Sequence, residues 1–298
     1  MEDAGAAAPS VINCQREATS VSGEPSPFRL GFAGRPAIDC HCHIYPEKIA
    51  ARAVESVGDF YNIPMDVPGG TGESLLGACA GSPIERFVVH SVAVRPDNVE
   101  AINDFIAAQC AEHPEFIGFA TMHQDYPNPE AEIERAIGLG LRGLKLHPDT
   151  QGVNMDDPRL MRVYEIIEGR LPLIMHCGDY RYGYSHPERM KRVLRAFPNL
   201  VVDAAHFGGW SVFDLAVEYL EDEQCFLDMS SAQTFLGPRR TAELVRIYGT
   251  DRIMFGSDFP MWDPVTEYEM FTALPFSDAE FDQMLRGNAE RFLGSFVG

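Results

Sequence analysis

The sequence predicts an α/β protein, a (β/α)8 TIM barrel with an N-terminal extension and an insertion after the first helix. From Pro36 onward, short apolar, β-branched runs alternate with polar or Gly/Pro breaks and with segments whose apolar residues recur at helical spacing. Eight such units without an internal break in composition favour a closed barrel over an open doubly wound sheet, the alternative fold. A nucleotide-binding sheet also lacks its usual signature here, because no Gly-rich phosphate loop follows a strand.

The predicted strands define one domain. We place them at Ala37–His43, Arg86–Val94, Phe116–Met122, Arg142–His147, Pro172–Cys177, Leu200–His206, Cys225–Ser231 and Arg252–Asp258. Residues 36–298 are therefore expected to form the barrel, and residues 1–35, rich in Ala, Ser, Gly and Pro, a flexible arm. The longest irregular stretch, Gly58–Glu85, is the insertion, and its length is typical of a lid or an oligomer contact.

Side chains that can bond the free N–H groups of a first helical turn predict several helix starts. Asp97 with Glu100 has the spacing of a capping box. Asn128 and Asp157 each precede a proline, which fits the first helical position because its missing N–H costs nothing there. The last helix is expected to start near Ser277.

The charge balance excludes some classes of partner. Lys and Arg number 24 and Asp and Glu 44, so the net charge is −20. Such a surface disfavours nucleic acid and anionic membranes. Seven cysteines, an odd number without repeated spacing, argue for a reducing compartment. With no signal-like start and no apolar run of spanning length, we expect a cytoplasmic protein that acts on a small molecule.

The first strand ends in a His-x-His pair. Because side chains alternate along a strand, His41 and His43 should point to the same side with Asp39 below them, while Cys40 and Cys42 face the helices. Two imidazoles on adjacent inward positions can coordinate one metal ion. Catalytic residues of barrels gather where the strands end, so polar residues at these ends carry the most weight.

Four later strands also end in polar side chains, namely Lys145 with His147, His176, His206 and Asp258. A lone histidine at a strand end is usually a satisfied polar residue. Several imidazoles and carboxylates in one barrel mouth would be costly to bury without a charge partner. A divalent cation removes this conflict, and imidazoles with one carboxylate form a typical Zn²⁺ set that Mn²⁺, Fe²⁺ or Co²⁺ also accept.

These motifs, in this order, resemble the amidohydrolase superfamily. The residues are the His41-x-His43 pair, His176, His206 and Asp258 in Gly256-Ser257-Asp258-Phe259-Pro260. More narrowly, they are similar to the amidohydrolase-related branch, which includes aminocarboxymuconate-semialdehyde decarboxylase and the hydroxybenzoate decarboxylases. The resemblance covers about residues 37–296.

The resemblance implies a role for each motif residue. His41, His43, His176 and Asp258 would hold one divalent ion, with Zn²⁺ expected first, and a water would fill the remaining position. His206 would lie beside that water and orient or protonate. Chemistry agrees, because a metal lowers the pKa of its water, Asp258 can accept a proton, and His206 can relay one.

Substrate-binding residues are expected on strand four and on the loop after strand five. Some branches of the superfamily carboxylate a strand-four lysine to bridge two metals, so Lys145 keeps a binuclear site open. Binding of a substrate carboxylate by Lys145 or His147 is the preferred interpretation. Arg181 could hold a carboxylate and Tyr182 could stack on a planar substrate, although this loop could equally pack a subunit interface. Homodimers are common in this branch.

Two enzyme classes remain open. The preferred prediction is a metal-dependent hydrolase that uses an activated water on a small carbonyl or carboxylate compound. The alternative is a metal-dependent non-oxidative decarboxylase of an aromatic or unsaturated acid, with Asp258 or His206 protonating the carbon that loses CO₂. A non-catalytic scaffold with a decayed site is a third hypothesis, and the complete ligand set argues against it.

Overall fold

The computed structural model of the chain describes residues 34–294. The predicted arm of residues 1–35 lies outside the described residues apart from its last two. There, the backbone N–H of Arg35 donates to the hydroxyl of Tyr268 (2.9 Å), and its guanidinium pairs with Asp278 and Asp282 at 2.5 Å each. The start of the barrel is thus fastened to helices from its C-terminal end.

All eight predicted strands are found, and they pair in parallel. They are β1 (Ala37–His43), β2 (Ile84–His90), β3 (Phe116–Thr121), β4 (Gly143–Leu146), β5 (Leu173–Met175), β6 (Val202–Ala204), β7 (Leu227–Asp228) and β8 (Ile253–Met254). The first six form one sheet in chain order, and β7 pairs with β8. Most are shorter than predicted, because the polar residues at their ends already belong to the connecting loops.

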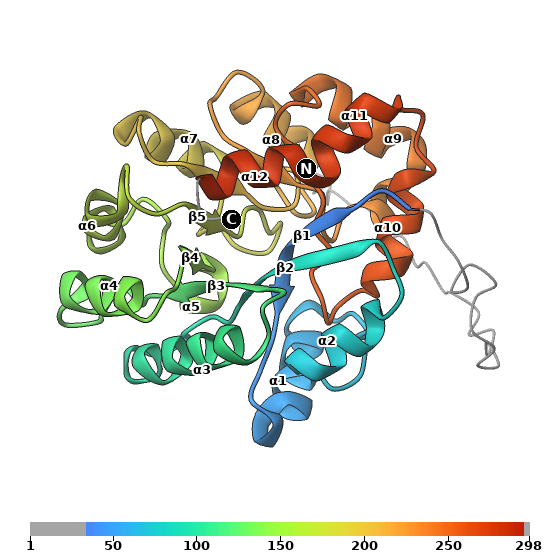
Figure 1. Cartoon of the computed structure of the whole chain (residues 1–298). Coiled ribbons are helices and arrows are strands. Elements are labelled where there is room, and N and C mark those ends of the chain that lie inside the picture. Colours follow the sequence, from blue (N-terminus) through green and yellow to red (C-terminus); the bar gives the residue numbers. More distant parts are fainter. Residues whose placement is uncertain (1–33, 295–298) are drawn as a thin grey trace, which may run out of the picture.

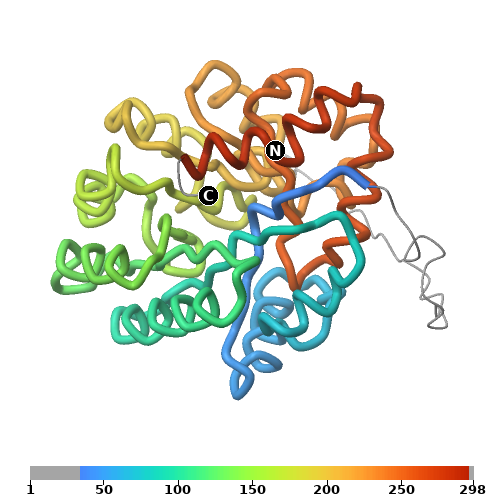
Figure 2. The backbone as a smooth tube through the Cα atoms, viewed as in Figure 1, coloured from blue at the N-terminus to red at the C-terminus, as the bar shows by residue number. Residues whose placement is uncertain are grey.

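Backbone contacts close the two sheets into a barrel. Asp203 bridges to Phe226 between β6 and β7, and Cys42 bridges to Phe259 between β1 and the segment after β8. The N–H of Cys40 donates to the carbonyl of Phe255 at 2.9 Å. Figure 2 shows the chain running round a ring, so that its first and last elements meet. The (β/α)8 barrel prediction is confirmed.

Helices surround the strands (Figure 1). They are α1 (Glu47–Tyr61), α2 (Gly72–Cys79), α3 (Val99–Glu112), α4 (Pro129–Gly138), α5 (Pro148–Gln151), α6 (Pro158–Ile167), α7 (Pro187–Ala196), α8 (Phe213–Leu220), α9 (Gln233–Tyr248), α10 (Pro264–Thr272), α11 (Asp278–Asp282) and α12 (Asn288–Leu293). A 3₁₀ turn (Pro96–Asn98) precedes α3, and a π-helical turn (Gln283–Gly287) joins α11 to α12. None of the helices within residues 34–294 has both the length and the hydropathy needed to cross a membrane.

Most of the predicted helix starts are confirmed. Asn128 and Asp157 cap α4 and α6 with their side chains, and Ser277 forms a capping box with Glu280 at α11. The capping box predicted for Asp97 is wrong. Asp97 lies inside the 3₁₀ turn, and its carboxylate is taken by the Arg95 guanidinium, so α3 begins without a side-chain cap.

The insertion after α1 is more ordered than predicted. Thr71 starts α2 with a capping box, in which its hydroxyl accepts from the N–H of Ser74 at 3.1 Å. Before that helix, the N–H groups of Asp66 and Val67 donate to the carbonyls of Met261 and Pro260. The insertion is therefore bonded to the loop that follows β8, beside Asp258.

Two hydrophobic layers stabilise the barrel. The larger lies between the strands and the helices. The smaller fills the inside of the barrel and contains, among others, Ile38, Cys40, Val88, Phe119 and Met254. Residues of α12 pack on this inner layer, and Figure 1 shows α12 crossing in front of the strands. The polar strand ends lie beyond the inner layer, toward the opposite end of the barrel.

Candidate metal centre and catalytic site

A β-bulge in β1 aims the His-x-His pair. From Asp39 to Cys42 the pairing with β2 advances by three residues on β1 but by two on β2. Strict alternation is therefore broken, and the prediction that Cys40 faces the helices is wrong. Cys40 packs in the inner layer and Cys42 in the outer one. Oδ1 of Asp39 accepts the N–H groups of His41 and Ser257, so this carboxylate joins β1 to the segment after β8.

Asp228, at the end of β7, fixes the tautomer of His41. Its Oδ2 lies 2.7 Å from Nδ1 of His41, and both side chains are fully buried. A carboxylate at this distance accepts the Nδ1–H, which leaves Nε2 with a free lone pair. Lys145 Nζ lies 2.9 Å from that Nε2. Burial lowers the pKa of Lys145 to about 8, while Asp258 and Asp228 oppose the shift.

Asp258 joins the two histidines of β1. Its Oδ1 is 3.5 Å from Nε2 of His41 and 3.5 Å from Nε2 of His43, while its Oδ2 accepts the hydroxyl of Ser231 at 2.5 Å. Asp258 has a positive φ of 62°, as does Ser231 with 52°. Such conformations cost about 1–3 kcal/mol and persist where the surroundings impose them, commonly at functional sites.

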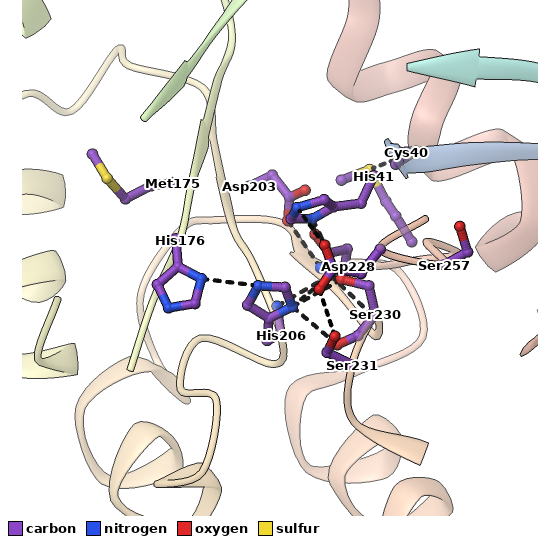
Figure 3. A network of polar contacts seen from close by, with 12 residues as sticks. Cys40, His41, Met175, His176, Asp203, His206, Asp228, Ser230, Ser231 and Ser257 are labelled. Atoms are coloured by element: carbon purple, nitrogen blue, oxygen red, sulfur yellow. Dashed lines mark hydrogen bonds and ion pairs between the residues drawn. The ribbon is translucent and has the colours of Figure 1, made fainter. Parts of the chain in front are cut away.

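His206 links the predicted ligands of β5 and β1. Its Nε2 is 3.1 Å from Nδ1 of His176, and its ring centroid is 4.9 Å from that of His41. On the other side, Nδ1 of His206 meets the hydroxyl of Ser230 at 2.9 Å. Figure 3 shows this chain, in which Asp228 lies between His206 and His41. The structure thus brings His41, His43 and Asp258 together directly, and His176 through His206.

The imidazoles are held in the form that binds metals. Burial lowers the pKa of His43, His147 and His176 well below 6.5, and that of His206 to about 4. Neutral imidazole is the ligand form. The carboxylate below them keeps its charge, because His41 holds the pKa of Asp228 well below 3.8 against the effect of burial. Neutral nitrogens and buried carboxylates form a donor set that fits a divalent transition metal.

A second group surrounds His147. Its Nε2 is 2.6 Å from the hydroxyl of Tyr61, and its ring stacks on His176 with centroids 3.8 Å apart. Oδ2 of Asp149 lies 3.5 Å from Nε2 of His176, whereas Oδ1 of Asp149 is buried without a hydrogen-bond partner among residues 34–294. Burial raises the pKa of Asp149 to about 6.

Arg181 is engaged by the protein itself. Its guanidinium bonds both carboxylate oxygens of Asp179 at 2.9 and 2.6 Å and also the carbonyl of Phe60. The guanidinium carbon lies 4.8 Å from the ring centroid of Phe60, 5.4 Å from that of Tyr61 and 5.2 Å from that of Tyr182. The loop after β5 is thereby clamped to the end of α1, next to His147. Substrate binding by Arg181 and Tyr182 stays a prediction.

Sequence reasoning missed several polar residues of this site. Asp228 ends β7, and His90 ends the apolar strand β2, just as His176 follows β5. The predicted strands Arg86–Val94 and Cys225–Ser231 run past these two residues, so only the shorter strands of the structure place them at strand ends. Tyr61 could not have been found this way, because it ends α1 and meets His147 through tertiary packing.

Comparisons with known proteins identify the family of the chain. The model of the family described as "Amidohydrolase" matches residues 38–295. A 2-amino-3-carboxymuconate-6-semialdehyde decarboxylase of Dictyostelium discoideum is 26% identical over 241 residues, which cover 66% of this chain and 67% of the relative.

Solved structures share the fold. An uncharacterised TIM-barrel protein of Bordetella bronchiseptica is 23% identical, with a TM-score of 0.68, covering 87% of this chain and 98% of that one. A dihydroxybenzoic acid decarboxylase of Polaromonas sp. JS666, solved with manganese and 2-nitroresorcinol, is 17% identical, with a TM-score of 0.69, covering 87% and 97%. With the family model matching nearly the whole described barrel, the chain belongs to the amidohydrolase family.

Proposed function

We propose that the protein is a metal-dependent, non-oxidative decarboxylase of an aromatic or unsaturated acid. The proposal is carried by one observation: aromatic side chains lie next to the buried imidazoles and carboxylates of the site. Phe60, Tyr61 and Tyr182 surround the Arg181 guanidinium next to His147 and His176. Two of the similar proteins named above are decarboxylases, which favours this reaction over the hydrolysis expected first from the sequence.

The predicted ligands are His41, His43, His176 and Asp258. When bound, a divalent ion would polarise substrate oxygens as a Lewis acid. Manganese in the Polaromonas structure supports a divalent ion without deciding between Mn²⁺ and Zn²⁺ here. The structure offers Asp228 to keep His41 oriented and Ser231 to orient Asp258.

Lys145 is the best-placed cation for a substrate carboxylate. It is fully buried at the carboxyl end of β4, and its Nζ has His41 as neighbour rather than a carboxylate salt-bridge partner within residues 34–294. Arg181, in contrast, is already paired with Asp179. A planar acid held at Lys145 and His147 would lie against Tyr61, whose ring centroid is 6.2 Å from that of His147.

The reaction itself needs no oxidant. The bond to the carboxylate carbon breaks, CO₂ leaves, and the electron pair stays on the former neighbour carbon, which takes up a proton. We propose that His206 or Asp258 delivers that proton, because both lie at the centre of the cluster and contact Ser230 and Ser231, respectively.

Isotopes test the reaction class. Protein loaded with Mn²⁺ or Zn²⁺ is incubated with hydroxybenzoates, unsaturated dicarboxylates, lactones and amides in D₂O and in H₂¹⁸O. We expect CO₂ release from an acid, one deuterium at the carbon that lost CO₂, and no ¹⁸O in the organic product. If a lactone or amide is instead converted to a product that contains ¹⁸O from the water, without CO₂ release, the hydrolase is favoured and the decarboxylase is overturned.

A pair of variants tests the catalytic role of His206. His206→Asn should lower the turnover of the metal-loaded protein by at least about a hundredfold, in the range of general acid–base contributions. His113→Asn is the matched control, since His113 follows α3 outside the cluster and pairs with Glu73. Equal activity of both variants would contradict the role of His206.

A further inference from the structure

His90 is a buried imidazole without a hydrogen-bond partner in the part of the chain that the structure describes. It is the last residue of β2, lies opposite His43 in the β1–β2 register, and is 0% exposed. Within residues 34–294, neither Nδ1 nor Nε2 has a hydrogen-bond partner. Burying such a group unpaired costs about 1–3 kcal/mol. Either the barrel tolerates this cost in stability, or a bound group that is not part of the polypeptide interacts with the ring nitrogens.

The ring lies against both histidines of β1. Its centroid is 4.4 Å from that of His43 and 5.0 Å from that of His41, with the rings at 86° and 73°. One nitrogen of each of the three histidines lies within 4.8 Å of one nitrogen of each other. Edge-on rings with converging nitrogens are arranged as ligands of one ion. Packing alone would not bring the nitrogens of three rings together, and it would not leave both nitrogens of His90 without hydrogen bonds.

Among the described residues, the polar groups near His90 contact other side chains. Lys145 Nζ is bonded to His41, and Asp258 Oδ1 lies near His41 and His43. His43 and His90 stand side by side because the bulge in β1 restores the register after Asp39. The bulge therefore aligns the histidines of two neighbouring strands at the same height.

We propose that His90 is a ligand of the metal ion and forms a three-imidazole set with His41 and His43. This inference rests on the metal dependence of the proposed function and adds a donor from β2 to the predicted set. Three neutral imidazoles favour Zn²⁺, Co²⁺ or a similar transition ion over Mg²⁺ or Ca²⁺, which prefer oxygen.

Cobalt binding tests the assignment. Full-length protein is stripped with a chelator and titrated with Co²⁺ against a chromophoric competitor, for the wild type, His90→Gln and the control His113→Gln. We expect His90→Gln to lose at least about tenfold in affinity, the smallest effect typical of residues that support a metal site, and the control to keep wild-type affinity. Equal affinity of all three proteins would overturn the proposal.

X-ray absorption of the cobalt-loaded proteins separates a ligand from a packing residue. The number of imidazoles around cobalt should fall by one in His90→Gln. An unchanged number, even with weaker binding, makes His90 structural and overturns the proposal. If the variant fails to fold, ¹¹³Cd-loaded wild type with ¹⁵N-labelled histidine decides. We expect a ring nitrogen assigned to His90 to be coupled to cadmium, and an uncoupled His90 would contradict the proposal.

The same titration keeps the two proposals apart. A wild type that binds no stoichiometric transition metal defeats the proposed function and the inference together. A wild type that binds one ion with no contribution from His90 defeats the inference alone.

Discussion

The two ends of the barrel are built from the same strands and have opposite chemistry. Near their amino ends the strands fill the inside with Ile38, Cys40, Val88 and other apolar side chains, closed off by Phe292 of α12. Near their carboxyl ends the same strands carry His41, Lys145 and other polar groups that are equally buried. The apolar end therefore stabilises the barrel, while burial of the polar groups at the other end costs stability that their chemistry requires.

Backbone conformation shows the same division. His206, Phe207, Ser231 and Asp258 all have positive φ and all follow β6, β7 or β8. These conformations are unfavourable for residues other than glycine. They persist because side chains and neighbouring strands fix the loops, as when the N–H of His206 donates to Asp228.

The largest expected effect on stability is at the apolar end. Phe292 is 2% exposed, and its ring packs against those of Phe119 and Phe226 with centroids 6.0 and 5.7 Å away. Phe292→Ala should lower the free energy of unfolding by about 3–5 kcal/mol. Urea unfolding measures this loss. Metal affinity of the folded variant should stay within about twofold of wild type, and a large loss of affinity would break the division between the ends.

A buried carboxyl near the polar end should make stability depend on pH. Glu267 of α10 is 2% exposed and bonded to Gln233, and burial raises its pKa to about 7 from 4.5. The folded state therefore holds a proton that the unfolded state releases between pH 4.5 and 7. This stabilisation is complete below about pH 4.5 and disappears as the pH rises through 7. The difference corresponds to about 3 kcal/mol.

Glu267→Gln removes this titration. We expect the variant to be more stable than wild type by up to about 3 kcal/mol at pH 8, with a much smaller difference at pH 5, in urea unfolding at both pH values. Glu269→Gln on the same helix is the control, because Glu269 is only partly buried. A constant difference between Glu267→Gln and wild type across this range would contradict the buried proton.

The smallest of these effects concerns metal affinity. Asp228→Asn replaces the carboxylate that accepts the Nδ1–H of His41. We expect a roughly 10–100-fold loss of Co²⁺ or Zn²⁺ affinity, which is typical when such a supporting hydrogen bond is lost. Competition with a chromophoric chelator measures it. Unchanged affinity, with the protein folded, would show that Asp228 does not orient His41 for a ligand.

Much of the architecture was predictable because it is local. The eight strands and the caps at Asn128, Asp157 and Ser277 follow from residue pattern and short-range hydrogen bonding. The cap at Asp97 failed because a neighbouring Arg95 competes for the carboxylate. The α2 helix inside the insertion was missed, although Thr71 and Ser74 form its capping box.

The barrel and the polar residues near its strand ends follow from the sequence, because the hydrophobic periodicity that specifies strands and helices is local. The direction of those side chains depends on the folded barrel. One extra residue in β1 places Cys40 in the inner layer and Cys42 in the outer one. The meetings of His41 with Asp228, His43 with His90, and His147 with Tyr61 join segments distant in sequence, so they depend on barrel closure.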